Sequence, residues 1–88
     1  MANIRSEEKR ARIAKVRALR NASRKSATKT AIKRFEAALA EGNKEDIEAT
    51  FKKAVRLIDK IAAKGIIHPN ARDRKKSQLA RKLNQAQL

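Results

Sequence analysis

The sequence of 88 residues has no cysteine, one histidine, one proline, two glycines and only two aromatic residues, both phenylalanine. Without cysteine, the chain cannot form a disulfide framework, a thiolate zinc site or a cysteine nucleophile. A single histidine excludes a multi-histidine metal site, and no Ser, His and carboxylate pattern resembles a catalytic triad. We therefore expect a protein without metal or other cofactor and without catalytic residues, hence not an enzyme.

Acidic residues and long apolar runs are also scarce. The chain carries 24 Lys and Arg against 9 Asp and Glu, a net charge of +15. No apolar run approaches the roughly 20 residues of a membrane span, and charges occur throughout the first 20 residues, unlike in a secretory signal. The arginine-rich start resembles an organelle transit peptide, but Glu7 and Glu8 argue against one. This balance predicts a polyanionic partner, with nucleic acid favoured over an anionic membrane surface.

Helix-breaking residues occur in only two places, so the chain divides into three segments. These segments are rich in Ala, Lys, Arg, Glu, Leu and Gln, which favour helix. We predict helices at about 6–41, 44–64 and 69–86, within a single domain covering 1–88.

Each junction carries recognisable capping residues. Gly42 suits the left-handed residue that ends a helix, and Asn43 suits the cap that begins the next. Gly65 is the corresponding stop for the second helix. Pro69 fits the first turn of the third, where its missing N–H is not needed.

Apolar residues with helical spacing predict how the helices pack. The second helix carries them at Ile47, Phe51, Ala54, Ile58 and Ile61. The first helix has a matching stripe only in its second half, at Thr28, Ile32, Phe35 and Leu39. A short connection makes these two segments antiparallel. We therefore predict an all-α three-helix bundle, with a long and highly basic first helix extending from a helical hairpin core.

Charge is distributed unevenly along the chain. Residues 1–34 have a net charge of +10, residues 35–63 of −1 and residues 64–88 of +6. The middle segment is therefore interpreted as a scaffold between two cationic binding regions.

The first cationic region points its charges in all directions around the predicted helix. Its cations are Arg5, Lys9, Arg10, Arg12, Lys15, Arg17, Arg20, Arg24 and Lys25. Such a helix has no face to pack on its own core, and like charges three or four residues apart destabilise it. We expect it to fray in the free protein and to order on a polyanion. It lacks the broad apolar face of a membrane-surface helix.

Further cations and short polar side chains complete the predicted nucleic-acid surface. They are Asn3, Asn21, Lys29, Lys33, Asn70, Arg72, Arg74, Lys75, Lys76, Ser77, Arg81 and Lys82. Because both phenylalanines are assigned to the core, base stacking has little support, and recognition of a folded RNA by its shape and phosphates fits better. A nucleoid-type protein that binds duplex DNA is the alternative, and a helical protein–protein interaction module is a second one.

Four stretches of the sequence, in the same order and spacing, resemble the bacterial small-subunit ribosomal protein S20 family. They are M-A-N-I-R-S from residue 1, K-S-A-T-K-T-A-I-K-R-F from residue 25, K-K-A-V-R-L-I-D-K from residue 52, and K-G-I-I-H-P-N-A-R-D-R-K-K-S-Q-L-A-R-K-L-N from residue 64. The resemblance implies a structural constituent of the cytoplasmic ribosome, present as a monomer with few protein contacts. It also implies direct binding to 16S-type ribosomal RNA during assembly, bridging the 5′ domain and the 3′ minor domain.

The same resemblance marks which positions would face the RNA. They lie in Asn3–Arg12, Lys25–Lys33 and Lys64–Lys82, which adds Lys64 and His68 to the residues above. For His68 two interpretations stay open, a capping or connecting residue and a contact with phosphate or sugar.

Overall fold

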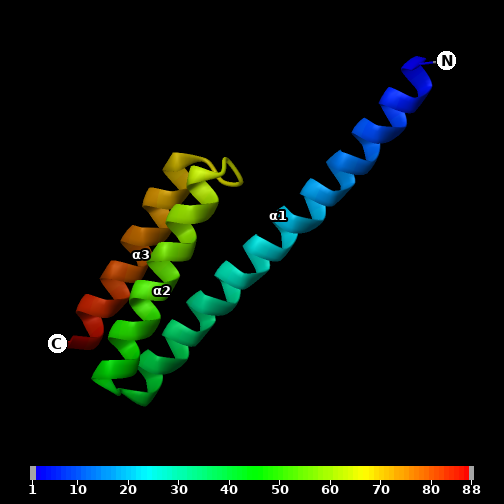
Figure 1. Ribbon diagram of the computed structural model, residues 1–88. Helices are drawn as coiled ribbons and strands as arrows, with labels where there is room; N and C mark the ends of the chain where they lie inside the picture. Colours follow the sequence, from blue (N-terminus) through cyan, green and yellow to red (C-terminus); the bar gives the residue numbers. More distant parts are fainter. Residues whose placement is uncertain (1, 88) are drawn as a thin grey trace.

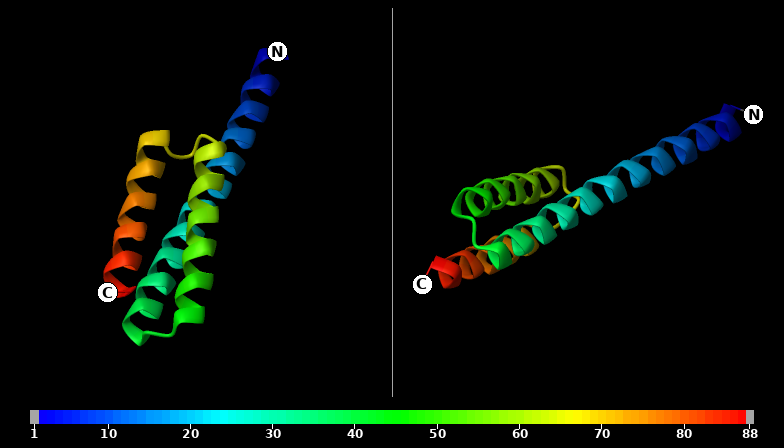
Figure 2. Two further views of the ribbon diagram at one scale, coloured as in Figure 1. Left: turned by 90° about the vertical axis from the view of Figure 1, so that its left-hand side faces the viewer. Right: turned by 90° about the horizontal axis from the view of Figure 1, so that it is seen from below.

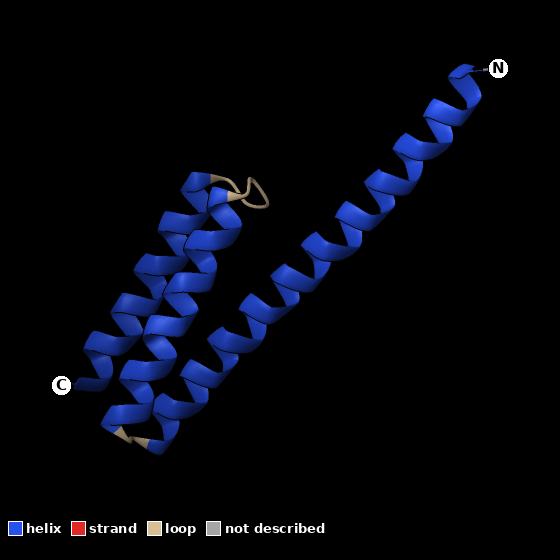
Figure 3. Cartoon of the chain, viewed as in Figure 1, coloured by secondary structure: helices blue, strands red, loops and turns tan. Residues whose placement is uncertain are grey.

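The computed structural model describes the backbone of residues 2–87 and the side chains of residues 5–86. Within 2–87 it contains three helices and no strand: α1 (Ala2–Glu41), α2 (Lys44–Ala63) and α3 (Pro69–Gln87), drawn in Figures 1 and 3. The predicted all-α class with a long first helix is confirmed. The first helix begins at residue 2 instead of about residue 6, since neither proline nor glycine interrupts the segment between them.

The three helices form a bundle at one end of the molecule only. The C-terminal half of α1 runs antiparallel to α2, and α3 lies along α2 (Figures 1 and 2). The molecule measures 66 × 22 × 13 Å along its principal axes. A helix of this length rises about 1.5 Å per residue, so α1 alone accounts for roughly 60 Å. The N-terminal half of α1 therefore projects beyond the bundle.

The turn between α1 and α2 follows its sequence signals. Gly42 has a φ of 81°, and its N–H donates to the carbonyl of Ala38 at 2.9 Å. The side-chain oxygen of Asn43 accepts the backbone N–H of Glu45 at 3.1 Å and, more weakly, that of Asp46 at 3.5 Å. These two carboxylates lie in the first turn, at the positive end of the helix dipole. The predicted capping roles of Gly42 and Asn43 are confirmed.

The connection from α2 to α3 begins with a Schellman motif. Gly65, with a φ of 76°, donates to the carbonyl of Ala62 at 3.0 Å, and Ile66 donates to that of Ile61 at 2.9 Å. Lys64 is the C-cap of α2, whose last helical residue, Ala63, lies one residue before the predicted end. Pro69 occupies the first position of α3, as predicted.

The core lies where the three helices meet. Phe35 and Ile58 are fully buried, and Ala54 and Leu79 join them in one cluster. The residues packed around this cluster are Ile32, Leu39, Phe51, Leu57, Ile67 and Leu83, all partly buried. Thr28 is buried too, and its hydroxyl donates to the carbonyl of Arg24 at 2.9 Å. Both predicted apolar stripes therefore face the core.

The N-terminal arm, defined here as residues 5–27 of α1, has no part in this core. Every side chain in it is exposed except that of Asn21, which is half-buried. Its large apolar residues stay in solvent as well, with Ile13 at 42%, Val16 at 46% and Leu19 at 65% exposed. The arm thus contributes no side chain to the core, as its charge pattern predicts, and only its last residues lie beside α2.

Candidate nucleic-acid interface

The N-terminal arm is the most cationic part of the described structure. Nine Lys and Arg side chains of residues 5–27 are exposed, against two carboxylates, Glu7 and Glu8. At about 1.5 Å per residue the arm is roughly 35 Å long. Because the cations surround the helix, the arm can meet phosphates on several sides at once, as it would between backbones of a folded RNA.

Two of the α3 cations predicted at the interface form ion pairs with carboxylates of the other helices. Lys76 lies 3.2 Å from Asp59 of α2, and the Nζ of Lys82 lies 2.7 Å from a carboxylate oxygen of Glu36 in α1. Both pairs join α3 to its neighbours, a role in the fold that the sequence does not reveal. Exposed ion pairs contribute at most about 1 kcal/mol, so a phosphate can compete for either lysine.

The remaining cations of α3 differ in exposure. Arg72 pairs with the neighbouring Asp73 at 3.0 Å and is half-buried, as is Lys75. Arg74 and Arg81 are exposed. Of the short polar residues predicted on this helix, Asn70 and Ser77 are exposed. α3 therefore carries exposed cations beside cations held in ion pairs, whereas every cation of the arm is exposed.

His68 is the N-terminal cap of α3. Its Nδ1 accepts the backbone N–H of Asn70 at 3.1 Å, and its carbonyl accepts that of Arg72 at 3.1 Å. The structure therefore supports the capping interpretation for Nδ1. The ring is exposed, so contact of its other nitrogen with RNA remains a prediction.

The other predicted positions lie along α1 and at the end of α2. Lys25, Lys29 and Lys33 follow one another at intervals of four residues and are all exposed. Lys64 is exposed at the end of α2, and Asn21 accepts a long contact of 3.5 Å from Arg24. The side chain of Asn3, also predicted at the interface, lies outside the described residues.

Several cations that were not predicted at the interface lie close together in the structure. Arg34 of α1 and Lys53 of α2 line one groove between these helices, and Lys60 lines its continuation. The overall charge of the middle segment concealed this arrangement. The signal that could have revealed it is the spacing of Lys53, Lys60 and Lys64, which places them on one side of a helix.

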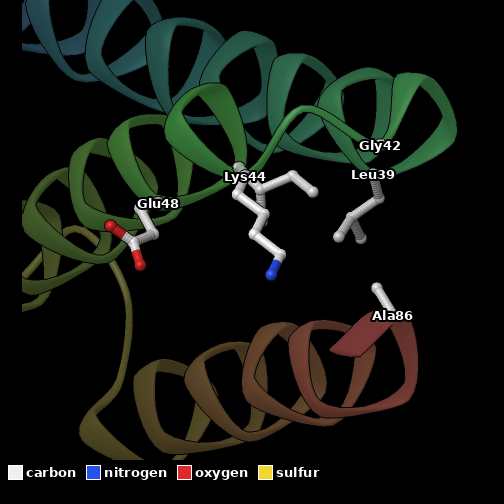
Figure 4. A pocket seen from close by; sticks show the side chains of 6 residues that line it. Leu39, Gly42, Lys44, Glu48 and Ala86 are labelled. Carbon is white, nitrogen blue, oxygen red and sulfur yellow. The ribbon is translucent and has the colours of Figure 1, made fainter. Parts of the chain in front are cut away.

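A pocket at the other end of the bundle offers no chemistry comparable to that of an enzyme. It lies between the α1–α2 turn and the end of α3, where Leu39 and Ala86 point toward each other (Figure 4). Lys44 and a single carboxylate, Glu48, complete its polar lining, without the paired groups of general acid–base catalysis.

Across the described part of the chain, no cluster of three His, Cys, Asp or Glu side chains could hold a metal ion. Nor does any helix within residues 2–87 combine the length and apolar character of a membrane span.

The sequence of this chain is similar to those of known proteins over nearly its whole length. The sequence profile of the family described as "Ribosomal protein S20" matches residues 2–84. The chain is 51% identical to the small ribosomal subunit protein bS20 of Heliobacterium modesticaldum, over 98% of each chain. It is 50% identical to bS20 of Desulforamulus reducens, over 96% of each chain, and 48% identical to bS20 of Clostridium beijerinckii, over 96% of this chain and 97% of the relative.

These matches confirm the resemblance carried by the four sequence stretches. They also support the expectation of a structural protein, because the family consists of ribosomal components and not of enzymes. The chain belongs to the ribosomal protein S20 family.

Proposed function

We propose that this protein binds small-subunit ribosomal RNA directly and stabilises its fold during assembly, bridging the 5′ domain and the 3′ minor domain. As a member of its family it acts at the small ribosomal subunit, in the cytoplasm. The observation that carries the proposal is the N-terminal arm, a helix with nine exposed cations around it and no residue in the core.

RNA supplies the stabilising contacts that the arm does not receive from the bundle. Phosphates that contact its arginines and lysines release condensed counterions, which favours binding strongly at low salt. Arginine also donates bidentate hydrogen bonds to phosphate, and arginine is the commoner cation in the arm. If about eight phosphates are contacted, the logarithm of the affinity should fall with the logarithm of salt concentration with a slope of about −6 to −7.

The bridging role is supported by the placement of the two cationic regions. α2 packs against both α1 and α3, so the arm and the basic face of α3 belong to different helices separated by a scaffold (Figure 1). One chain can thus contact two RNA segments without bending. The identity of those segments comes from the resemblance to the family.

Competition binding tests the proposal. A labelled 5′-domain transcript is bound at about physiological salt, where binding through charge alone is weakened. Excess transfer RNA and duplex DNA are then added separately. We expect neither competitor to displace the protein, whereas an added 3′ minor-domain transcript should join the same complex. Ready displacement by duplex DNA would contradict the proposal and favour the nucleoid-type alternative.

A triple variant, Arg10→Gln, Arg12→Gln and Arg17→Gln, tests the arm specifically. All three side chains are exposed and distant from the core, so the bundle should keep its thermal transition. Affinity for the transcript should fall and the salt slope should become shallower by about one per lost phosphate contact. The triple variant Lys44→Gln, Lys52→Gln and Arg56→Gln removes the same charge from α2 and is the control.

A further inference from the structure

The groove between α1 and α2 is a second candidate site, and its cations come from both helices. Its lining includes Arg24 and Arg34 of α1 and Lys53, Lys60 and Lys64 of α2. We infer that this α1–α2 groove binds one strand of the sugar-phosphate backbone of the RNA, so that α2 takes part in recognition beyond its role as a scaffold. The inference rests on the proposed function and adds a site to it.

The groove is continuous along the seam between the two helices. It consists of two hollows, and Ala27 and Leu57 line both of them. From Arg24 to Arg34 the seam extends ten residues, or about 15 Å at the rise of an α-helix. This length is enough for a short stretch of a single sugar-phosphate strand.

Charge within α2 is segregated, although its total is close to zero. Asp59 points toward α3, where it pairs with Lys76, and Glu36 of α1 pairs with Lys82 on the same flank. Lys53 lies on the opposite flank, in the groove. Lys60 lines the groove as well and also borders the outer side of α2, next to Arg56. Asp59 and Glu36 are therefore directed toward α3 and away from the groove.

The five cations of the groove face no carboxylate. No Asp or Glu lines either hollow, and within residues 5–86 none of the five forms an ion pair. Five positive charges along one groove, without carboxylates among its lining, raise the local potential and attract an anionic occupant. They also repel one another until such an occupant binds.

The remaining lining suits a sugar-phosphate strand. Ala27 and Leu57 form a small apolar surface on which the carbon face of a ribose can pack. Ser23, Ser26 and Thr30 bring hydroxyls to the same hollow, and Thr30 donates to the carbonyl of Ser26 at 3.0 Å, which leaves its oxygen able to accept. A 2′-hydroxyl can donate to such an oxygen, a contact that DNA lacks.

The test compares two double variants that remove the same charge from the same helix. Lys53→Gln with Lys60→Gln alters the groove, whereas Lys52→Gln with Arg56→Gln alters exposed cations on the outer side of α2. Affinity for the 5′-domain and 3′ minor-domain transcripts is measured over a series of salt concentrations. Circular dichroism melts establish that both variants keep the fold.

We expect the groove variant to bind roughly 10- to 30-fold more weakly near physiological salt, with a salt slope shallower by about two. The control variant should lose less than half as much affinity as the groove variant, and its salt slope should change by less than half as much. Equal affinities and slopes for the two variants would overturn the groove while leaving the proposed function intact. If the unmodified protein itself shows no preference for these transcripts over duplex DNA, both proposals fail.

A chemical readout checks the location directly. Lysine acylation followed by mass spectrometry compares the reactivity of Lys53, Lys60 and Lys52 in the protein alone and with the transcript. Protection of Lys53 and Lys60, but not of Lys52, is the expected result. Unchanged reactivity of Lys53 and Lys60 in the bound protein would overturn the inference. Protection of Lys53 and Lys60 by polyglutamate alone would also overturn it, because that result would indicate an acidic protein partner.

Discussion

The rings of Phe35 in α1 and Phe51 in α2 contact each other in a tilted arrangement, with their centroids 5.6 Å apart and their planes at 53°. These are the only two aromatic residues of the chain, and both are used to join the hairpin. Tilted aromatic pairs of this kind contribute about 0.5–1.5 kcal/mol beyond the burial of their surface. Neither ring is therefore available as a platform for a base, which favours recognition through backbone and shape.

Replacing Phe35 should be the more damaging change of the two. Phe35 is fully buried, so Phe35→Ala should reduce the free energy of unfolding by about 3–5 kcal/mol. Phe51 is half-buried, so Phe51→Ala should cost less. Urea unfolding followed by circular dichroism measures both, and Leu19→Ala in the exposed arm is the control, with an expected change within about 0.5 kcal/mol. A larger loss for Phe51→Ala than for Phe35→Ala would contradict this account of the core.

The N-terminal arm should be the least stable part of α1. Its side chains take no part in the core, and Arg20 and Arg24 are like charges at a destabilising spacing. In hydrogen exchange of the free protein, amides of residues 5–24 should exchange much faster than those of residues 31–41. Addition of the ribosomal RNA transcript should slow exchange in the arm. Equal protection of both segments without RNA would show that the arm needs no partner to remain helical.

Loss of the cap at His68 should weaken the start of α3. His68→Ala removes the acceptor of the Asn70 N–H and should cost about 0.5–2 kcal/mol in chemical denaturation. His68→Asn supplies another acceptor and should restore most of this stability. If both variants were equally destabilised, the cap would not explain the role of His68. RNA affinity of His68→Asn tests separately whether the ring also contacts the RNA.

The pair formed by Lys82 and Glu36 should contribute little and respond to salt. A double-mutant cycle with Lys82→Gln and Glu36→Gln should give a coupling of about 0.2–1 kcal/mol, because both groups are nearly half exposed. The coupling should approach zero at about 1 M salt, where screening is strong. A coupling that persists at high salt would contradict the assignment of this contact as an exposed, salt-screened ion pair.

Local features of this protein could be predicted from its sequence because they depend on neighbouring residues. The turn at Gly42 and Asn43 requires a left-handed residue followed by a side-chain acceptor, and both requirements are visible in the chain. Helix periodicity likewise identified Phe35 and Ile58 as core residues. The exposed arm followed from cations that recur on every side of one helix.

Tertiary structure alone decided which charges oppose each other. Asp59 and Lys76 are 17 residues apart, and Glu36 and Lys82 are 46 apart, so no local pattern relates them. The crossing and register of packed helices determine which flank of α2 faces α3 and which flank, with Lys53, faces the groove. A charge total along the chain averages over these flanks, whereas packing separates them, and this separation turns a nearly neutral helix into one with a cationic side.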